Sequence, residues 1–157
     1  MADCVIALIT ADLISALHNK TIEIDGASVT NYAEGQRTVL NTQGKNVYTE
    51  VAGPWPEEIT LDGCEQHIGL HYVVECHINN INDSTGDPII IRCKNVGADL
   101  AKLIMTDITR GGNALFTKID GQPYYYFMSD NTSTEFIYRV DVIVQVFIDI
   151  NDPYFQK

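Results

Sequence analysis

The sequence is poor in basic residues. It holds 10 lysines and arginines against 21 aspartates and glutamates, which gives a formal net charge of −11 at pH 7. Tight, salt-sensitive binding of nucleic acid needs basic groups that replace phosphate counterions, so this balance argues against that class of protein. The apolar stretches fall well short of the roughly 18 residues that a membrane helix needs, and no signal-peptide pattern opens the chain. These absences predict an acidic, soluble, intracellular protein without a membrane partner.

Motifs of the common enzyme classes are also missing. The sequence contains no G-x-S-x-G elbow, no Walker A loop, no G-x-G-x-x-G and no H-E-x-x-H, which are the patterns of several hydrolase, nucleotide-binding and metalloprotease sites. Gly111-Gly112 follows a predicted helix, where a glycine pair is typical of a helix end and not of a phosphate-binding loop. The sequence therefore predicts no catalytic residues and no cofactor.

The chain is long enough for one domain with a real core. It has 157 residues, of which 45% are apolar and 20% charged, so we expect a single domain over residues 1–157. Apolar residues recur at three- and four-residue steps between Asp3 and His18, which predicts an amphipathic helix. A second helical stripe follows Asn95, runs through Ile108 and ends at Gly111-Gly112.

Two later segments alternate with a period of two. From Ile68 to Ile78 the even positions are apolar apart from Cys76, and from Phe136 to Ile150 every even position is aromatic or aliphatic. Strict alternation predicts strands with one buried face. Between them, Leu115–Ile119 predicts a strand that runs into an Asp120-Gly121 turn, and Pro88–Cys93 predicts a short strand or an extended segment.

The region from about residue 21 to residue 63 carries weaker signals. We interpret it as a loop-rich excursion with one or two hairpins, which includes an Asp25-Gly26 turn and short strands at Arg37–Leu40 and Asn46–Val51 around a turn at Gly44. Gly53–Pro56 cannot be a central strand, because two prolines remove ladder donors. The order of elements predicts an α+β fold, in which a mainly antiparallel sheet carries two helices packed on one face.

A group of possible zinc ligands lies near the first alternating strand: Cys64, His67, His71, Cys76 and His77. Zinc needs ligands that converge tetrahedrally, but the alternation places Cys76 on the core face and both His71 and His77 on the other. A set of His71, Glu75 and His77 on the shared face stays geometrically possible. We favour a solvated or interface-facing surface without metal, on which the histidines could make assembly pH-sensitive. The role of the His67/His71/His77 group stays open.

The outer face of the last strand carries apolar residues as well. Ile137, Ile143 and Phe147 alternate there with Arg139 and Asp141. A monomer rarely exposes a contiguous apolar strip, so these five residues are the candidate interface with another subunit or protein. The run Tyr124-Tyr125-Tyr126 could stack on bases, but with few basic residues nearby a strand edge or an assembly contact is the better interpretation.

The pattern of elements resembles the tail terminator, or tail completion, proteins of long-tailed bacteriophages. The likeness consists of the opening helix Val5–Leu17, the strand Ile68–Ile78, a second helix from Gly97, then Gly111-Gly112-Asn113, a hairpin and the long strand Phe136–Ile150. It is best from Gly97 to the end and poor between Thr21 and Gly63.

The resemblance implies a structural virion protein and not an enzyme. Proteins of this family form a ring, commonly a hexamer, that caps the tail tube, ends its polymerisation and offers the docking surface for the head. The implied partners are further copies of the chain, the tail tube protein and a head-completion or neck protein, with assembly in the host cytoplasm. Genome DNA passes through the lumen without specific binding. Two alternatives remain: another neck or tail-tube ring subunit, or a small cytosolic enzyme or ligand-binding domain.

Overall fold

A computed structural model describes residues 4–36, 46–62, 65–79, 87–129, 134–149 and 152–156. Its elements, in chain order, are α1 (Val5–Leu17), β1 (Lys20–Ile24), β2 (Ala27–Gly35), β3 (Val47–Asp62), β4 (Glu65–Ile78), α2 (Ile89–Arg92), α3 (Val96–Ile104), β5 (Phe116–Ser129), β6 (Thr134–Asp149) and β7 (Asp152–Gln156). In the described part of the chain, no helix is both long enough and apolar enough to span a bilayer.

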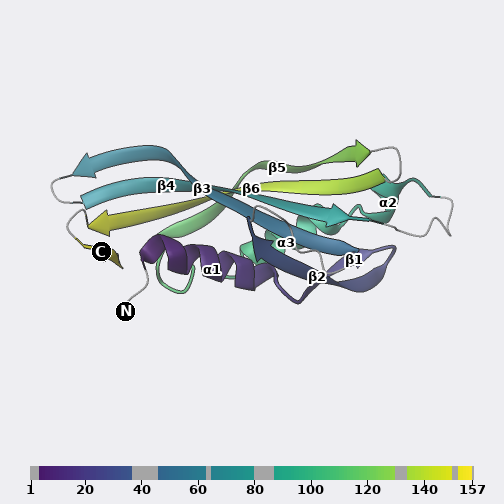
Figure 1. Cartoon of the computed structure of the whole chain (residues 1–157), viewed down its shortest axis with the longest axis horizontal. Helices are drawn as coiled ribbons and strands as arrows, with labels where there is room; N and C mark the ends of the chain where they lie inside the picture. The colour runs from purple at the N-terminus through teal and green to yellow at the C-terminus, as the bar shows by residue number, and fades with distance from the viewer. Residues whose placement is uncertain are drawn as a thin grey trace.

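All the strands belong to one sheet. Its order is β1-β2-β3-β4-β6-β5, and β7 pairs with the end of β6. The pairing of β2 with β3 is parallel, whereas the other described pairs are antiparallel. The expected α+β class is confirmed at this level, but the sheet is mixed, because the chain crosses over between β2 and β3. Figure 1 shows that the long strands lie over the helices.

The core lies between the helices and the even-numbered face of β6. Side chains at even positions from Phe136 to Ile148 are at most 9% exposed, and those of β4 from Ile68 to Ile78 are at most 7% exposed. They share one apolar cluster with Val5, Ile9, Leu13 and Leu17 of α1 and with Leu100 and Ile104 of α3. The alternation therefore identified the buried faces of both strands correctly, up to Ile148.

Helix α1 has nearly its predicted bounds, whereas α3 is shorter than predicted. Residue Cys4 precedes α1, and Asp3, where the predicted helix begins, lies outside the described residues. Helix α3 ends at Ile104, so Ile108 is not part of its buried stripe and is 45% exposed. The reason is local: Asp107 and Arg110 bind backbone groups of the segment after α3 and fold it into a compact turn.

The interpretation of residues 21–63 as loop-rich is wrong. The Asp25-Gly26 turn is confirmed, with φ of 54° and 75° between β1 and β2. Arg37–Leu40 and Gly44 lie outside the described residues, but Val47–Asp62 is one 16-residue strand. It tolerates Pro54 and Pro56 because β2 pairs only up to Val51 and the ladder to β4 is interrupted on both sides of Trp55-Pro56.

Two further local predictions need correction. Ile89–Arg92 forms the short helix α2 instead of a strand, and Arg92 is buried in a bidentate contact with Asp25, at 2.6 and 2.7 Å. Asp120-Gly121 is not a hairpin turn. Strand β5 continues beside β6 as far as Ser129, and the residues between Asp120 and Tyr124 form a bulge. A bulge keeps the pairing partner while it changes the twist.

Candidate assembly surface

The odd-numbered side of β6 is less open than the sequence suggests. Ile137 is 0% and Ile143 is 4% exposed, so neither can present surface to a partner in this conformation. In the ladder, Ile137 lies between His77 of β4 and Tyr126 of β5, and Ile143 lies between His71 and Lys118. The predicted apolar strip is wrong for these two residues, because a central strand is flanked by long side chains on both sides.

The polar members of the predicted interface form the centre of an ion-pair chain. Arg139 donates to both carboxylate oxygens of Asp141, at 3.2 and 2.9 Å. His71 Nε2 lies 3.0 Å from Asp141 Oδ1, and His71 Nδ1 lies 3.1 Å from Glu57 Oε1. The chain of contacts thus joins β6, β4 and β3 across the outer face.

The second polar group surrounds His77, which is buried. Its Nδ1 lies 3.0 Å from Glu135 Oε1 and its Nε2 lies 3.8 Å from Glu75 Oε2. Its ring stacks on Tyr48 with centroids 4.7 Å apart. The Tyr48 hydroxyl donates to Glu135 at 2.9 Å and the Tyr126 hydroxyl donates to Glu75 at 2.8 Å. Side chains from four strands therefore surround His77, whose two ring nitrogens make no hydrogen bond themselves within the described part of the chain.

Burial and partners shift several pKa values on this face. Burial tends to raise the pKa of Asp141, but hydrogen bonds from Arg139 and His71 outweigh it and lower that pKa. Burial, with the neighbouring Glu75 and Glu34, raises the pKa of Glu50, and His77 opposes the shift. Burial and the bond to Glu135 raise the pKa of Tyr48, so this hydroxyl keeps its proton and remains a donor.

Phe147 and Trp55 are two of the accessible apolar groups of the outer face. Phe147 is half-buried, and its ring centroid lies 4.6 Å from that of His67. Trp55 is 47% exposed and lines a shallow polar groove of about 330 Å³. The other residues of that groove are Gln36, Glu50, Ala52, Val73, Glu75 and Arg139. This combination of charged, hydrogen-bonded and apolar groups resembles the mixed composition of a protein interface.

The possible zinc ligands of β4 lie on opposite faces of the sheet, as the alternation predicts. Cys76 is fully buried in the core cluster, where burial raises the pKa of its thiol to about 12, whereas His71 and His77 lie on the outer face among carboxylates. Cys64 lies outside the described residues. Within the described ranges, no group of three or more His, Cys, Asp or Glu side chains is arranged to hold a metal ion.

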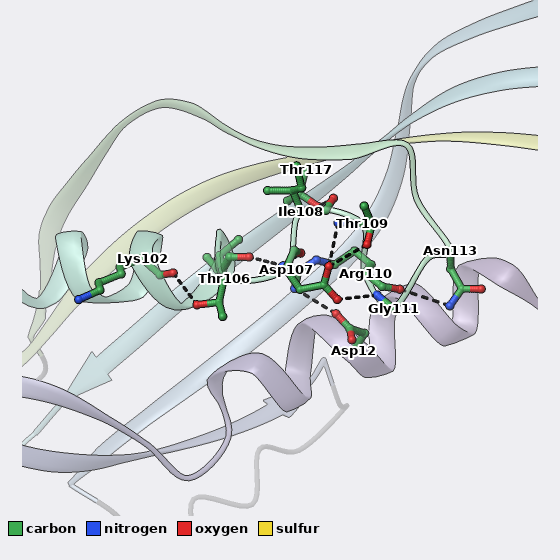
Figure 2. A network of polar contacts seen from close by, with 11 residues as sticks. Asp12, Lys102, Thr106, Asp107, Ile108, Thr109, Arg110, Gly111, Asn113 and Thr117 are labelled. Carbon is green, nitrogen blue, oxygen red and sulfur yellow. Dashed lines mark hydrogen bonds and ion pairs between the residues drawn. The ribbon is translucent and has the colours of Figure 1, made fainter.

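The sequence did not predict a further polar network, which lies in the helical layer. This network holds the turn between α3 and β5 against α1 (Figure 2). Arg110 is fully buried, donates to the carbonyl oxygens of Ile104 and Asp107, and lies 3.1 Å from Asp12 of α1. Asp107 accepts from the backbone of Thr109 and Gly111, at 3.0 and 2.7 Å, and these donors lower its pKa.

Three consecutive residues of this turn have left-handed backbone: Arg110, Gly111 and Gly112 have φ of 49°, 68° and 85°. Such a conformation suits glycine and is strained for arginine. The glycine pair does not mark the end of α3, which ends at Ile104, and nothing in the spacing showed that the arginine before it points inward. An aspartate two residues before a threonine is the local signal that could have predicted the turn. The network fixes one side of the helical layer and offers no reactive group.

Comparisons with known proteins add no relatives: no family model matches the chain, and no curated protein matches it either.

Proposed function

We propose that this chain is a structural subunit of a ring that caps the tail tube of a long-tailed bacteriophage. The observation that carries the proposal is the order and placement of its elements. Its elements include, in chain order, an opening helix, the strand ending at Ile78, the helix Val96–Ile104, a Gly111-Gly112 turn and the long strand β6, which lies between β4 and β5. Both helices share one core with that strand.

The outer face of the sheet is the proposed contact with neighbouring subunits or with the tube. Since Ile137 and Ile143 are buried, the contact depends on Arg139, Asp141 and Phe147, which are half-buried. A ring needs heterologous contacts, in which one surface of each subunit meets a different surface of the next. A charged surface with one accessible aromatic group suits a contact that forms between folded, soluble subunits.

The net charge supports the proposed passage of DNA through the ring. At −11, the chain repels phosphate groups and so does not hold the genome in transit. The ring would present its two ends to the tail tube protein and to a neck or head-completion protein. As a structural subunit it would perform no catalysis and need no cofactor.

Deletion of the gene in the phage that encodes this chain tests the proposal. A tube without its cap keeps growing, so we expect filled heads and abnormally long tails that do not join, as seen by electron microscopy. Tails of normal length that fail to join heads would favour another neck subunit. Normal tails joined to heads would contradict any role in capping or joining.

A complementation experiment tests the surface separately. We expect Phe147→Glu to restore fewer than a tenth of the infectious particles that the wild-type gene restores, while the purified variant stays folded. The matched control is Ile108→Glu, which changes an exposed apolar residue on the turn after α3. Equal rescue by both variants would remove Phe147 from the contact.

A further inference from the structure

Apart from the short strand β7, which pairs only with the end of β6, the described sheet has three unpaired edges, and two of them are blocked. Along β1, the Glu23 N–H donates to Asp99 of α3 at 2.8 Å and the Asp25 N–H donates to the Arg92 carbonyl at 2.9 Å. Along β3 beyond Val51, Pro54 and Pro56 lack donors and two bulges interrupt the strand. Blocked donors, prolines and bulges are the usual means by which proteins prevent edge-to-edge pairing.

The third edge is the second half of β5, where Pro123 and the bulge after Asp120 lie just before Tyr124 but no such protection lies within Tyr124–Met128. Strand β5 pairs with β6 on one side, and no described strand pairs with its other side. From Tyr124 to Met128 the sequence is Tyr-Tyr-Tyr-Phe-Met, without a charge or a proline. An uncharged, aromatic edge of this kind favours strand addition.

The apolar side chains of this segment are exposed on both faces of the sheet. On the core side, Tyr125 and Phe127 are 43% and 50% exposed, although their rings lie 5.3 and 5.2 Å from that of Phe136. On the outer side, Tyr124 and Met128 are 46% and 55% exposed. A helix laid on one face would cover only half of them. A further strand beside β5 would cover both rows at once.

We propose that the segment Tyr124–Met128 pairs antiparallel with the same segment of a second copy of this chain. The charge of the molecule favours this contact over others between two copies. Each copy carries −11, so most surfaces bring like charges together, whereas this segment places no charges opposite each other. Because the other two edges are blocked, the contact is isologous: β5 meets β5 around a two-fold axis and the pairing closes on itself.

The contact is expected to be weak. An aromatic side chain offers about 150–250 Å², so four side chains that are about half exposed give roughly 400 Å² a copy, half of what a standard stable interface buries on each partner. The inference does not depend on the proposed ring, since an isologous pair cannot by itself build a six-membered ring. Within such an assembly it would join two rings or two half-rings.

Sedimentation equilibrium of the purified chain over a concentration series tests the pairing. We expect the average mass to rise about twofold between about 10 μM and 1 mM, the range of a weak interface, from 17.5 kDa for single chains or from the mass of the ring where the chain forms rings. Met128→Lys puts a charge at each end of the paired segment, opposite Tyr124 of the other copy, where pairing would have to remove it from water, and we expect it to weaken association at least tenfold. Within its own chain the new lysine lies opposite Glu135, so folding is not endangered.

The matched control is Ile108→Lys, which changes a similarly exposed apolar residue on the turn after α3 and should leave the association unchanged. Hydrogen exchange of the wild type gives a second readout, with slower exchange of the Tyr124–Met128 amides at high concentration. A wild type that stays at 17.5 kDa, or a Met128→Lys variant that associates as tightly as the wild type, would overturn the pairing. If the wild type forms a hexamer and Met128→Lys leaves that hexamer unchanged, the pairing is overturned, whereas the proposed ring is not.

Discussion

The two faces of β4 and β6 follow the same alternation in the sequence, but different interactions stabilise them. On the core face, aliphatic and aromatic side chains from Phe136 to Ile148 pack against α1 and α3. On the outer face, Arg139, Asp141 and His71 form an ion-pair chain, and His77 stacks on Tyr48 between two glutamates. A period of two thus predicts which side of the strands faces the helices, but it does not predict how deeply residues on the other side are buried.

The largest expected effect comes from a charge on the core face. Val142 is fully buried, and Val142→Glu would bury an unpaired carboxylate at a cost of about 4 kcal/mol or more. That is most of the stability of an ordinary domain, so we expect little folded protein in urea titrations. Phe147→Glu places the same charge on the outer face and should cost about 1–2 kcal/mol. Equal losses would show that the two faces do not differ as described.

A smaller effect is expected from Asp141, and it depends on pH. Its folded pKa is lowered, so the unfolded chain takes up the proton first as the pH falls. The stabilisation is complete above the unfolded value of about 3.9 and is lost as pH falls through the folded pKa. We expect Asp141→Asn to cost about 1–3 kcal/mol at pH 7.

The pH dependence of that loss provides its own check. The difference in unfolding free energy between wild type and Asp141→Asn should be constant from pH 7 to about pH 5 and should shrink below about pH 4. Arg139→Gln removes the main donor to Asp141 and should therefore reduce the pH dependence of the unfolding free energy below about pH 5. A difference that grows as the pH falls would have the wrong sign for this account.

The smallest effect, with the opposite sign, is expected at Glu50. Its pKa is raised, mainly by burial, so the folded chain binds the proton first and stability is lost as pH rises through the unfolded value toward the folded one. We expect Glu50→Gln to raise the free energy of unfolding by up to about 0.5 kcal/mol at pH 7 and to have no effect near pH 3. Destabilisation at pH 7 would mean that Glu50 makes a favourable contact as an anion.

Much of the core could be predicted because its signals are local. The stripe Val5, Ile9, Leu13 and Leu17 and the even positions of β6 give their faces directly, and Asp25-Gly26 specifies its hairpin. The start of β3 was predicted as the short strand Asn46–Val51, but its continuation to Asp62 could not be predicted, because its prolines are acceptable only where β2 has ended. The burial of Ile137 and Ile143 depends on cross-strand neighbours that are distant in the sequence.

The interface was harder to predict than the core. Arg139, Asp141 and Phe147 lie on the outer face, as the alternation requires, but their ion pairs join strands about 70 residues apart in the chain. The exposed segment Tyr124–Met128 was visible as an aromatic run in the sequence. Its exposure became evident only once β5 was known to be an edge strand of the described sheet.

Native mass spectrometry combined with electron microscopy of the purified chain is the most direct test of the proposed ring. The account predicts closed rings and a mass near six times 17.5 kDa, or a small multiple of that mass if β5 also pairs between copies. We expect Phe147→Glu to remove the rings and leave folded single chains or β5-linked pairs. A wild-type protein that forms no rings at any concentration, alone or with its tail tube, would contradict the account.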